Sequence, residues 1–182
     1  MNKINLKSVI VTVVTISLSV LSYGQHNHNL MNMNHQKMME HKNITVMSVK
    51  LNDSNLNKAY IHYTMIKDAL YNADTKKVQM LSNMLVGILN TYGKAPDATD
   101  IADKLAKAAK IENQRTLFAN LSTAFEPLLK NNVSKGAIYK NFCPMANGSG
   151  AYWYSNSEKI VNPYFGEAMP SCGSVKDTYK SI

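Results

Sequence analysis

The residues with the clearest chemistry are soft metal ligands gathered near the start of the chain. The stretch HNHNLMNMNHQKMMEH, residues 26–41, holds four histidines and four methionines in sixteen residues. These candidate ligands are His26, His28, Met31, Met33, His35, Met38, Met39 and His41. Thioethers favour Cu(I), whereas imidazoles also bind Cu(II), Zn(II) and Ni(II). The stretch therefore indicates a metal-capturing segment of low selectivity; the alternative is a polar leader that binds no metal.

A second set of sulfur atoms lies near the C-terminus. Cys143 and Met145 are two residues apart in CPM, and Met169 and Cys172 are three residues apart in MPSC. Folding this segment back on itself would bring two thiols and two thioethers together. Such a soft donor set favours Cu(I), so we expect these four residues to form a defined copper site.

The two cysteines also allow other interpretations. Cys143 and Cys172 are the only cysteines of the chain. In an oxidising compartment they would form a disulfide that closes a loop of about 30 residues and contributes roughly 3.5 kcal/mol. A thiol oxidoreductase is a third interpretation. Because no C-x-x-C pair, catalytic triad, paired carboxylates or phosphate-binding glycine loop is visible in the sequence, we expect a protein that is not an enzyme.

The first 24 residues predict export. They combine two lysines with the apolar run Val9–Leu21 and small residues at Ser22 and Gly24. This is the pattern of a cleaved secretory signal, and the run is too short for a membrane span of about 20 residues. No cysteine follows the cleavage site, so a lipid anchor is not indicated. We expect a periplasmic or secreted protein that is not inserted in the membrane.

Residues 25–50 form the predicted N-terminal tail. Besides histidine and methionine, this segment is rich in Asn, Gln, Lys and Glu, so we expect it to be disordered without metal. A coil of about 25 residues spans about 25 to 30 Å. The tail ligands would therefore reach the C-terminal sulfurs.

Residues 51–132 show apolar residues at helical spacing and predict four helices. The first begins at Asp53 or Ser54, Asp74 caps the second, the third begins near Thr99, and a break at residues 110–113 precedes the fourth. We expect an all-α fold, a four-helix up-and-down bundle joined by short connections. The single histidine of this region, His62, is interpreted as a hydrogen-bonded helical residue rather than a ligand.

Residues 133–182 lose the helical period and gain glycine, proline and aromatic residues. The segments AIYKNF and AYWYS predict two short strands, with Asn147-Gly148 as the turn between them. We expect a short irregular or β-hairpin module that packs on the bundle and forms one globular domain with it. Its larger aromatic residues would cover the bundle; they are Trp153, Tyr154, Tyr164 and Phe165.

The charge of the chain excludes one class of partner. The formal net charge is +8, and it falls to +6 without the two lysines of residues 1–24. The lysines are spread along the chain rather than gathered in an arginine-rich stripe, so we expect no nucleic-acid partner.

Three segments resemble a known family. Residues 139–175, YKNFCPMANGSGAYWYSNSEKIVNPYFGEAMPSCGSV, together with YTMIKDALYNAD (Tyr63–Asp74) and QRTLFANLS (Gln114–Ser122), are similar to the family called domain of unknown function 3347. The matching motif positions are Cys143, Pro144, Met145, Gly150, Trp153, Asn162, Pro163, Tyr164, Gly166, Met169, Cys172 and Gly173. The chain departs from the pattern at Tyr154, where leucine is common. The resemblance implies a small exported protein, related to the C-terminal part of periplasmic adaptor subunits of heavy-metal efflux pumps.

The functional expectation combines both ligand sets. We expect a periplasmic copper-binding protein that buffers Cu(I) or passes it to an efflux system, with an efflux adaptor or another copper-handling protein as partner. The alternative is a helical interaction module, stapled by a Cys143–Cys172 disulfide, that docks on a periplasmic adaptor without metal.

Overall fold

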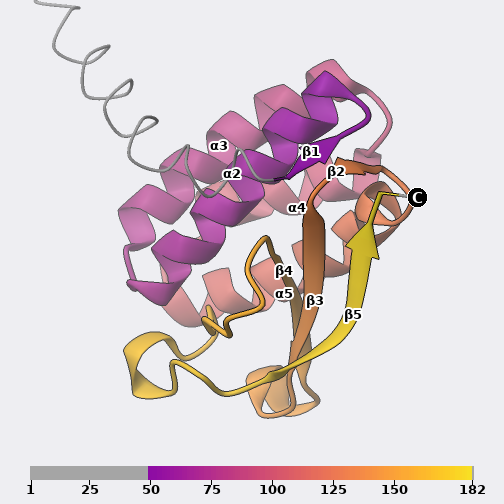
Figure 1. Cartoon of the computed structure of the whole chain (residues 1–182). Coiled ribbons are helices and arrows are strands. Elements are labelled where there is room, and N and C mark those ends of the chain that lie inside the picture. Colours follow the sequence, from indigo (N-terminus) through magenta and orange to yellow (C-terminus); the bar gives the residue numbers. More distant parts are fainter. Residues whose placement is uncertain (1–48, 182) are drawn as a thin grey trace, which may run out of the picture. The chain divides into compact units, whose positions relative to one another are not determined.

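The computed structural model describes residues 49–181 (Figure 1). The predicted signal and the eight ligands of residues 26–41 lie outside the described residues. Val49 is buried and Lys50 belongs to a strand, so these two residues at the end of the segment predicted as tail are part of the fold. Within residues 49–181 no helix combines the length and the apolar character that crossing a membrane requires.

The four predicted helices are present. They are α2 (Ser54–Tyr71), α3 (Thr75–Tyr92), α4 (Pro96–Lys107) and α5 (Ile111–Leu129). Each helix packs against the next one along the chain, and α2 also contacts α5. The third helix begins at Pro96 rather than Thr99, because proline fits the first helical position, where no N–H donor is needed.

Local chemistry explains how these helices begin and end. The Asp53 carboxylate accepts hydrogen bonds from the backbone N–H groups of Asn55 and Leu56, at 2.8 and 3.0 Å. Asp74 accepts one from the N–H of Lys77 at 3.0 Å. These bonds satisfy donors that a helix N-terminus leaves unpaired. Gly93 ends α3 with φ of 71°, a left-handed conformation that suits glycine.

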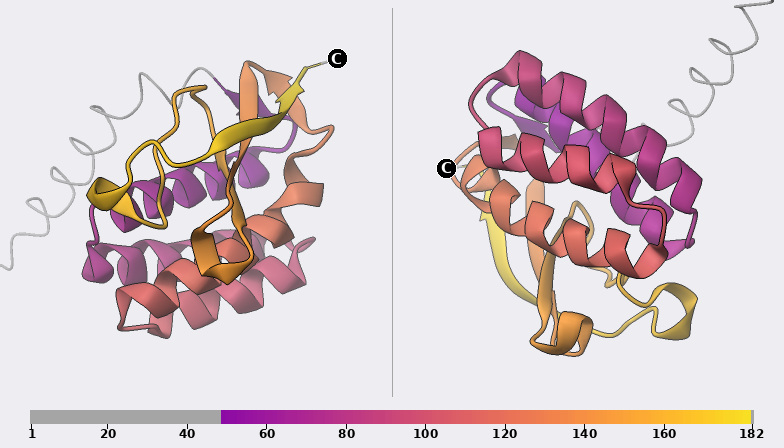
Figure 2. Two further views of the ribbon diagram at one scale, coloured as in Figure 1. Left: turned by 90° about the horizontal axis from the view of Figure 1, so that it is seen from below. Right: turned by 180° about the vertical axis from the view of Figure 1, so that it is seen from behind.

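The prediction of an all-α fold is wrong, because the described residues also contain two antiparallel sheets. One pairs β1 (Lys50–Leu51) with β2 (Val133–Lys135). The other has β3 (Ala137–Cys143) between β4 (Ala151–Ser155) and β5 (Ser174–Lys180). Figure 2 shows this second sheet lying against one side of the helices.

The missed strands lack an apolar pattern. The predicted segments AIYKNF and AYWYS correspond to β3 and β4. In contrast, β5 has the sequence SVKDTYK and buries only Tyr179. It is a strand because its backbone pairs with the open edge of β3, an interaction that sequence alternation does not report. β1 and β2 have two and three residues, too few to show a period.

The connection between β3 and β4 contains the predicted turn dipeptide. Residues 144–150 separate the two strands and include the short 3₁₀ helix η1 (Ala146–Gly148). Asn147 and Gly148 both have positive φ, 52° and 76°, as the predicted turn dipeptide requires. A second 3₁₀ helix, η2 (Gly166–Ala168), lies in the connection from β4 to β5.

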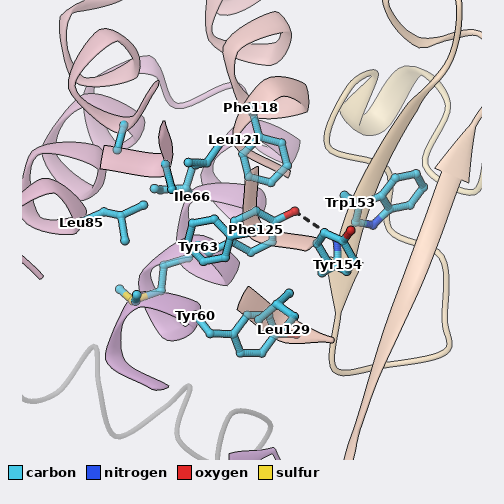
Figure 3. Close-up of a cluster of buried hydrophobic side chains, with 14 of the residues drawn as sticks. Tyr60, Tyr63, Ile66, Leu85, Phe118, Leu121, Phe125, Leu129, Trp153 and Tyr154 are labelled. Carbon is cyan, nitrogen blue, oxygen red and sulfur yellow. Dashed lines mark hydrogen bonds between the residues drawn. The ribbon is translucent and has the colours of Figure 1, made fainter. Parts of the chain in front are cut away.

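An aromatic cluster joins the helices to the sheet (Figure 3). The ring of Tyr63 in α2 stacks on Phe118 and Phe125 of α5, with centroids 4.9 and 4.8 Å away. The backbone N–H of Tyr154 in β4 donates to the Tyr63 hydroxyl at 3.1 Å. Tyr154 points into this cluster, and its neighbour Trp153 points away from it, as alternation along a strand requires. Trp153, Tyr154 and Tyr164 are buried, as predicted.

Candidate functional site

The structure brings the two cysteines into contact. Cys143 is the last residue of β3 and is fully buried. The pairing of β3 with β5 aligns Phe142 with Ser174, so Cys172, two residues before Ser174, lies beside the end of β3. The two Sγ atoms are 3.2 Å apart, and both cysteines are free thiols. Sheet register therefore positions a thiol pair from residues 29 apart in sequence.

Asn162 holds the segment that carries Cys172. Its side-chain Nδ2 donates to the carbonyl of Cys172 at 2.8 Å, and its backbone N–H donates to the carbonyl of Pro170 at 3.0 Å. Its Oδ1 accepts from the N–H of Tyr164 at 2.8 Å. Asn162 is fully buried, so these bonds form away from water. Sequence reasoning gave Asn162 no separate role; its only signal was its place in the motif NPYF.

Gly173 allows the chain to pass close to Trp153 on its way to the thiol pair. A Cβ atom on Gly173 would lie 2.7 Å from Cη2 of Trp153 and 2.9 Å from the carbonyl oxygen of Phe142. Gly173 also has φ of 141°, a conformation that side chains disfavour. The indole of Trp153 is completely buried, so it has little freedom to move aside. Glycine at position 173 therefore keeps Cys172 next to Cys143.

Two contacts fix the same segment to the helices. Arg115 of α5 donates from Nε to the carbonyl of Pro163 at 3.2 Å and from Nη2 to that of Leu70 at 3.4 Å. Gly166 packs against the end of α2, where a Cβ would lie 2.3 Å from the carbonyl oxygen of Tyr71. The connection before Cys172 is therefore positioned by both α2 and α5.

The two thiols differ in accessibility, and contact with Cys143 affects the protonation of Cys172. Cys143 is buried, whereas Cys172 is partly exposed. The hydrogen bond with Cys143 raises the pKa of the Cys172 thiol, and partial burial and the charge of Cys143 act in the same direction. Because metals and disulfides react with thiolates, a reagent that reaches this pair must displace a proton, and it meets Cys172 first.

The two thioethers lie at the surface. Met145 follows Cys143 by two residues and is 55% exposed, and Met169 is 37% exposed. The backbone N–H of Cys172 donates to the carbonyl of Met169 at 3.3 Å, which places these two residues in one turn. The structure thus brings the two thiols into contact. Participation of the thioethers in a metal site stays a prediction. Residues 49–181 contain no group of three or more His, Cys, Asp or Glu side chains placed so that they could hold a metal ion.

His62 lies in a different place. It is 6% exposed, and its Nδ1 is 3.0 Å from the carbonyl oxygen of Lys58, which agrees with the prediction of a hydrogen-bonded helical histidine. It borders a groove of about 390 Å³ lined by residues of α2 and α3, including Met84 and Ile88. Lys58 also lines this groove, and its positive charge disfavours a cation there.

Comparison with known proteins identifies the helical part. Residues 59–136 match the family described as protein of unknown function (DUF3347). The match confirms the predicted family and extends from α2 to β2, so the thiol pair lies beyond the matched DUF3347 residues. No curated protein and no solved structure matches the chain.

Proposed function

We propose that this protein is exported, binds Cu(I), and buffers the ion or passes it to an efflux system. The observation that supports the proposal is the contact between Cys143 and Cys172, whose Sγ atoms are 3.2 Å apart. Two soft thiolate ligands at one point, with methionines two and three residues away, form a donor set that favours Cu(I) over harder cations.

The geometry of the pair is close to that of two ligands on one ion. Two thiolates bound to a tetrahedral metal at about 2.3 Å lie about 3.8 Å apart. The thiol pair would therefore open by about 1 Å or less to take such an ion. The Cys172 side chain can make this small movement while Asn162 holds the Cys172 carbonyl, because Cys172 lies outside the strands, whereas Cys143 is held within β3.

The surrounding residues supply the rest of the site. Met145 and Met169 are exposed and lie two and three residues from the cysteines, so their thioethers would complete the coordination shell. Thioethers do not ionise and do not form disulfides, so they suit an oxidising compartment. In this proposal the histidines and methionines of residues 26–41 capture the ion and deliver it to the thiol pair.

The test is an anaerobic titration of the reduced protein with Cu(I) in competition with a chelator. We expect the Cys143→Ser/Cys172→Ser variant to lose the most tightly bound Cu(I). A variant lacking residues 25–48 should lose further, weaker equivalents and keep the tight one. If neither variant lowers stoichiometry or affinity, the proposal is wrong.

Matched methionine variants test the thioethers separately. We expect Met145→Leu and Met169→Leu to weaken the tight site, because leucine keeps the volume and removes the ligand sulfur. Met80→Leu is the control, since Met80 is 50% exposed like Met145 but lies on α3, outside the CPM and MPSC segments. Equal affinity in all three variants would exclude the thioethers and leave a site made by the thiols.

The same contact supports a second candidate, an interaction module closed by a Cys143–Cys172 disulfide. A pair of aromatic rings at the surface would provide its docking surface: Tyr152 is 38% exposed, and its ring centroid lies 4.7 Å from that of the half-buried Phe142. Lys140 lies 4.4 Å from the centroid of the Tyr152 ring. This candidate predicts no free thiols in the protein isolated from the periplasm and partner binding that is unchanged when metal is removed.

A further inference from the structure

The thiol pair combines contact with unequal access. The Sγ atoms are 3.2 Å apart, about 1.2 Å more than the bond length of a disulfide. Cys172 is partly exposed and lies in a turn, whereas Cys143 is buried at the end of a central strand. A reagent too large to enter the interior can therefore reach one thiol of the pair and not the other.

We propose that a low-molecular-weight disulfide oxidises this pair to an internal disulfide, with Cys172 as the attacking thiol and Cys143 as the resolving thiol, and that oxidation releases the bound metal. Formation of the internal disulfide follows from the thiol pair alone. The release step rests on the proposed function.

The chemistry is a two-step exchange. The Cys172 thiolate attacks one sulfur of the small disulfide R–S–S–R, forms a mixed disulfide and expels RS⁻. The Cys143 thiolate then attacks the Cys172 sulfur, forms the internal bond and expels the second RS⁻. Two protein thiolates are oxidised, R–S–S–R is reduced to two thiolates, and protons from the protein thiols pass to solvent. A bound Cu(I) ion keeps its oxidation state but loses both thiolate ligands.

The surroundings of the pair favour the second step. Asn162 anchors the carbonyl of Cys172, and the absence of a side chain at Gly173 lets Cys172 stay beside β3. Cys143 is therefore already within about 1 Å of bonding distance when the mixed disulfide forms on Cys172. Resolution should be faster than the first attack, so the mixed disulfide should not accumulate.

The experiment treats the reduced, metal-free protein with glutathione disulfide and follows its mass. We expect the wild-type chain to lose two hydrogens and to keep no glutathione. Cys143→Ala should keep one glutathione, because no resolving thiol remains. Cys172→Ala should react at least about tenfold more slowly than wild type, because the remaining thiol is buried. Circular dichroism confirms that both variants are folded, and alkylation of each variant after denaturation confirms its single thiol.

Two results would overturn the exchange: a lasting glutathione adduct on the wild-type chain, or a Cys172→Ala variant that reacts as fast as wild type. Release is then measured by adding glutathione disulfide to the Cu(I)-loaded protein in the presence of a Cu(I) chelator. Metal retained by the oxidised protein would overturn the switch and leave the copper proposal intact. If the reduced protein binds no Cu(I), the proposed function fails, and the mass measurement still decides the exchange.

Discussion

The contact between Gly173 and Trp153 gives the sharpest prediction about the thiol pair. In Gly173→Ala the new methyl group would lie 2.7 Å from Cη2 of Trp153 and 2.9 Å from the carbonyl oxygen of Phe142. Real Cβ atoms do not approach other atoms this closely, so the chain at position 173 or the indole ring must shift. Because Cys172 is the preceding residue, we expect the shift to separate its sulfur from that of Cys143.

The cost follows from two separate effects. Overpacking a filled interior costs about 1 to 3 kcal/mol. Alanine at φ of 141° adds backbone strain of about 1 to 3 kcal/mol. Alanine also restricts the unfolded chain, which returns about 0.4 to 1 kcal/mol. We therefore expect Gly173→Ala to lower the free energy of unfolding by about 1 to 5 kcal/mol.

Gly148→Ala provides the matched control. Gly148 also has positive φ, 76°, but a Cβ there would meet no atom within 4 Å. It carries the backbone strain without the collision, so its cost should be about 1 kcal/mol. In urea unfolding of the two reduced variants, the free energies of unfolding should differ by about 2 kcal/mol. This difference reports the collisions with Trp153 and with the Phe142 carbonyl, together with the stronger backbone strain at position 173.

A double-mutant cycle isolates the indole. Trp153→Phe removes the ring edge that the new methyl group would strike, so Gly173→Ala should cost less in the Trp153→Phe background than in wild type. Gly173→Ala should also slow formation of the internal disulfide, and Gly148→Ala should not. Additive stabilities, or unchanged disulfide formation in Gly173→Ala, would refute the idea that this contact positions Cys172.

Three further predictions concern contacts that the helices make with one another and with the C-terminal part of the chain. Tyr63→Phe should lower the free energy of unfolding by about 1 to 3 kcal/mol, because it removes a hydroxyl that is hydrogen-bonded within the core. Tyr60→Phe is the control and should cost little, since the buried Tyr60 hydroxyl has no hydrogen-bond partner among residues 49–181. Urea unfolding compares the two variants. Burial acts to raise the pKa of Glu126, but hydrogen bonds from Lys140 and Tyr179 lower it overall. The stability that ionised Glu126 contributes is therefore present above pH 4.5 and is lost as the pH falls through the lowered pKa of the folded state. In urea unfolding below pH 4.5, the stability of Glu126→Gln should therefore fall less steeply with pH than that of wild type. Equal dependence of stability on pH in both proteins would contradict this. Arg115→Met should lower the free energy of unfolding by about 1 to 3 kcal/mol, because it removes the hydrogen bonds to the carbonyl groups of Pro163 and Leu70. Thermal unfolding at constant pH would show this as a lower midpoint. An unchanged midpoint would mean that water replaces these hydrogen bonds.

The helices could be predicted because their signals are local. Asp53 and Asp74 cap the N-termini of α2 and α3, as their positions in the sequence predict, and Gly93 ends α3. The prediction of an all-α fold was wrong because a sheet forms between strands that are distant in sequence. Nothing within the β5 sequence SVKDTYK shows that β3 has an open edge. Similarly, β2 is a strand because it pairs with β1, and the contact between Ser134 and Lys50 joins residues 84 positions apart in sequence.

The candidate site shows the same division. The types and spacing of the four sulfur residues could be read from CPM and MPSC, and the structure brings Cys143 and Cys172 together. The roles of Gly173 and Asn162 could not be derived from spacing, because they depend on a backbone passing an indole ring and on a buried amide reaching a carbonyl. Such contacts exist only after the sheet has formed.

Helix α5 provides a common support for both cysteines. Glu126 binds Lys140 of β3 at 2.5 Å, and β3 ends in Cys143. Arg115, eleven residues earlier on the same helix, binds the carbonyl of Pro163 in the segment that leads to Cys172. A change in the position of α5 would therefore move β3 and the segment that leads to Cys172, and so alter the distance between the sulfurs. The helices within the DUF3347 match thus help to set the geometry of a thiol pair that lies outside it.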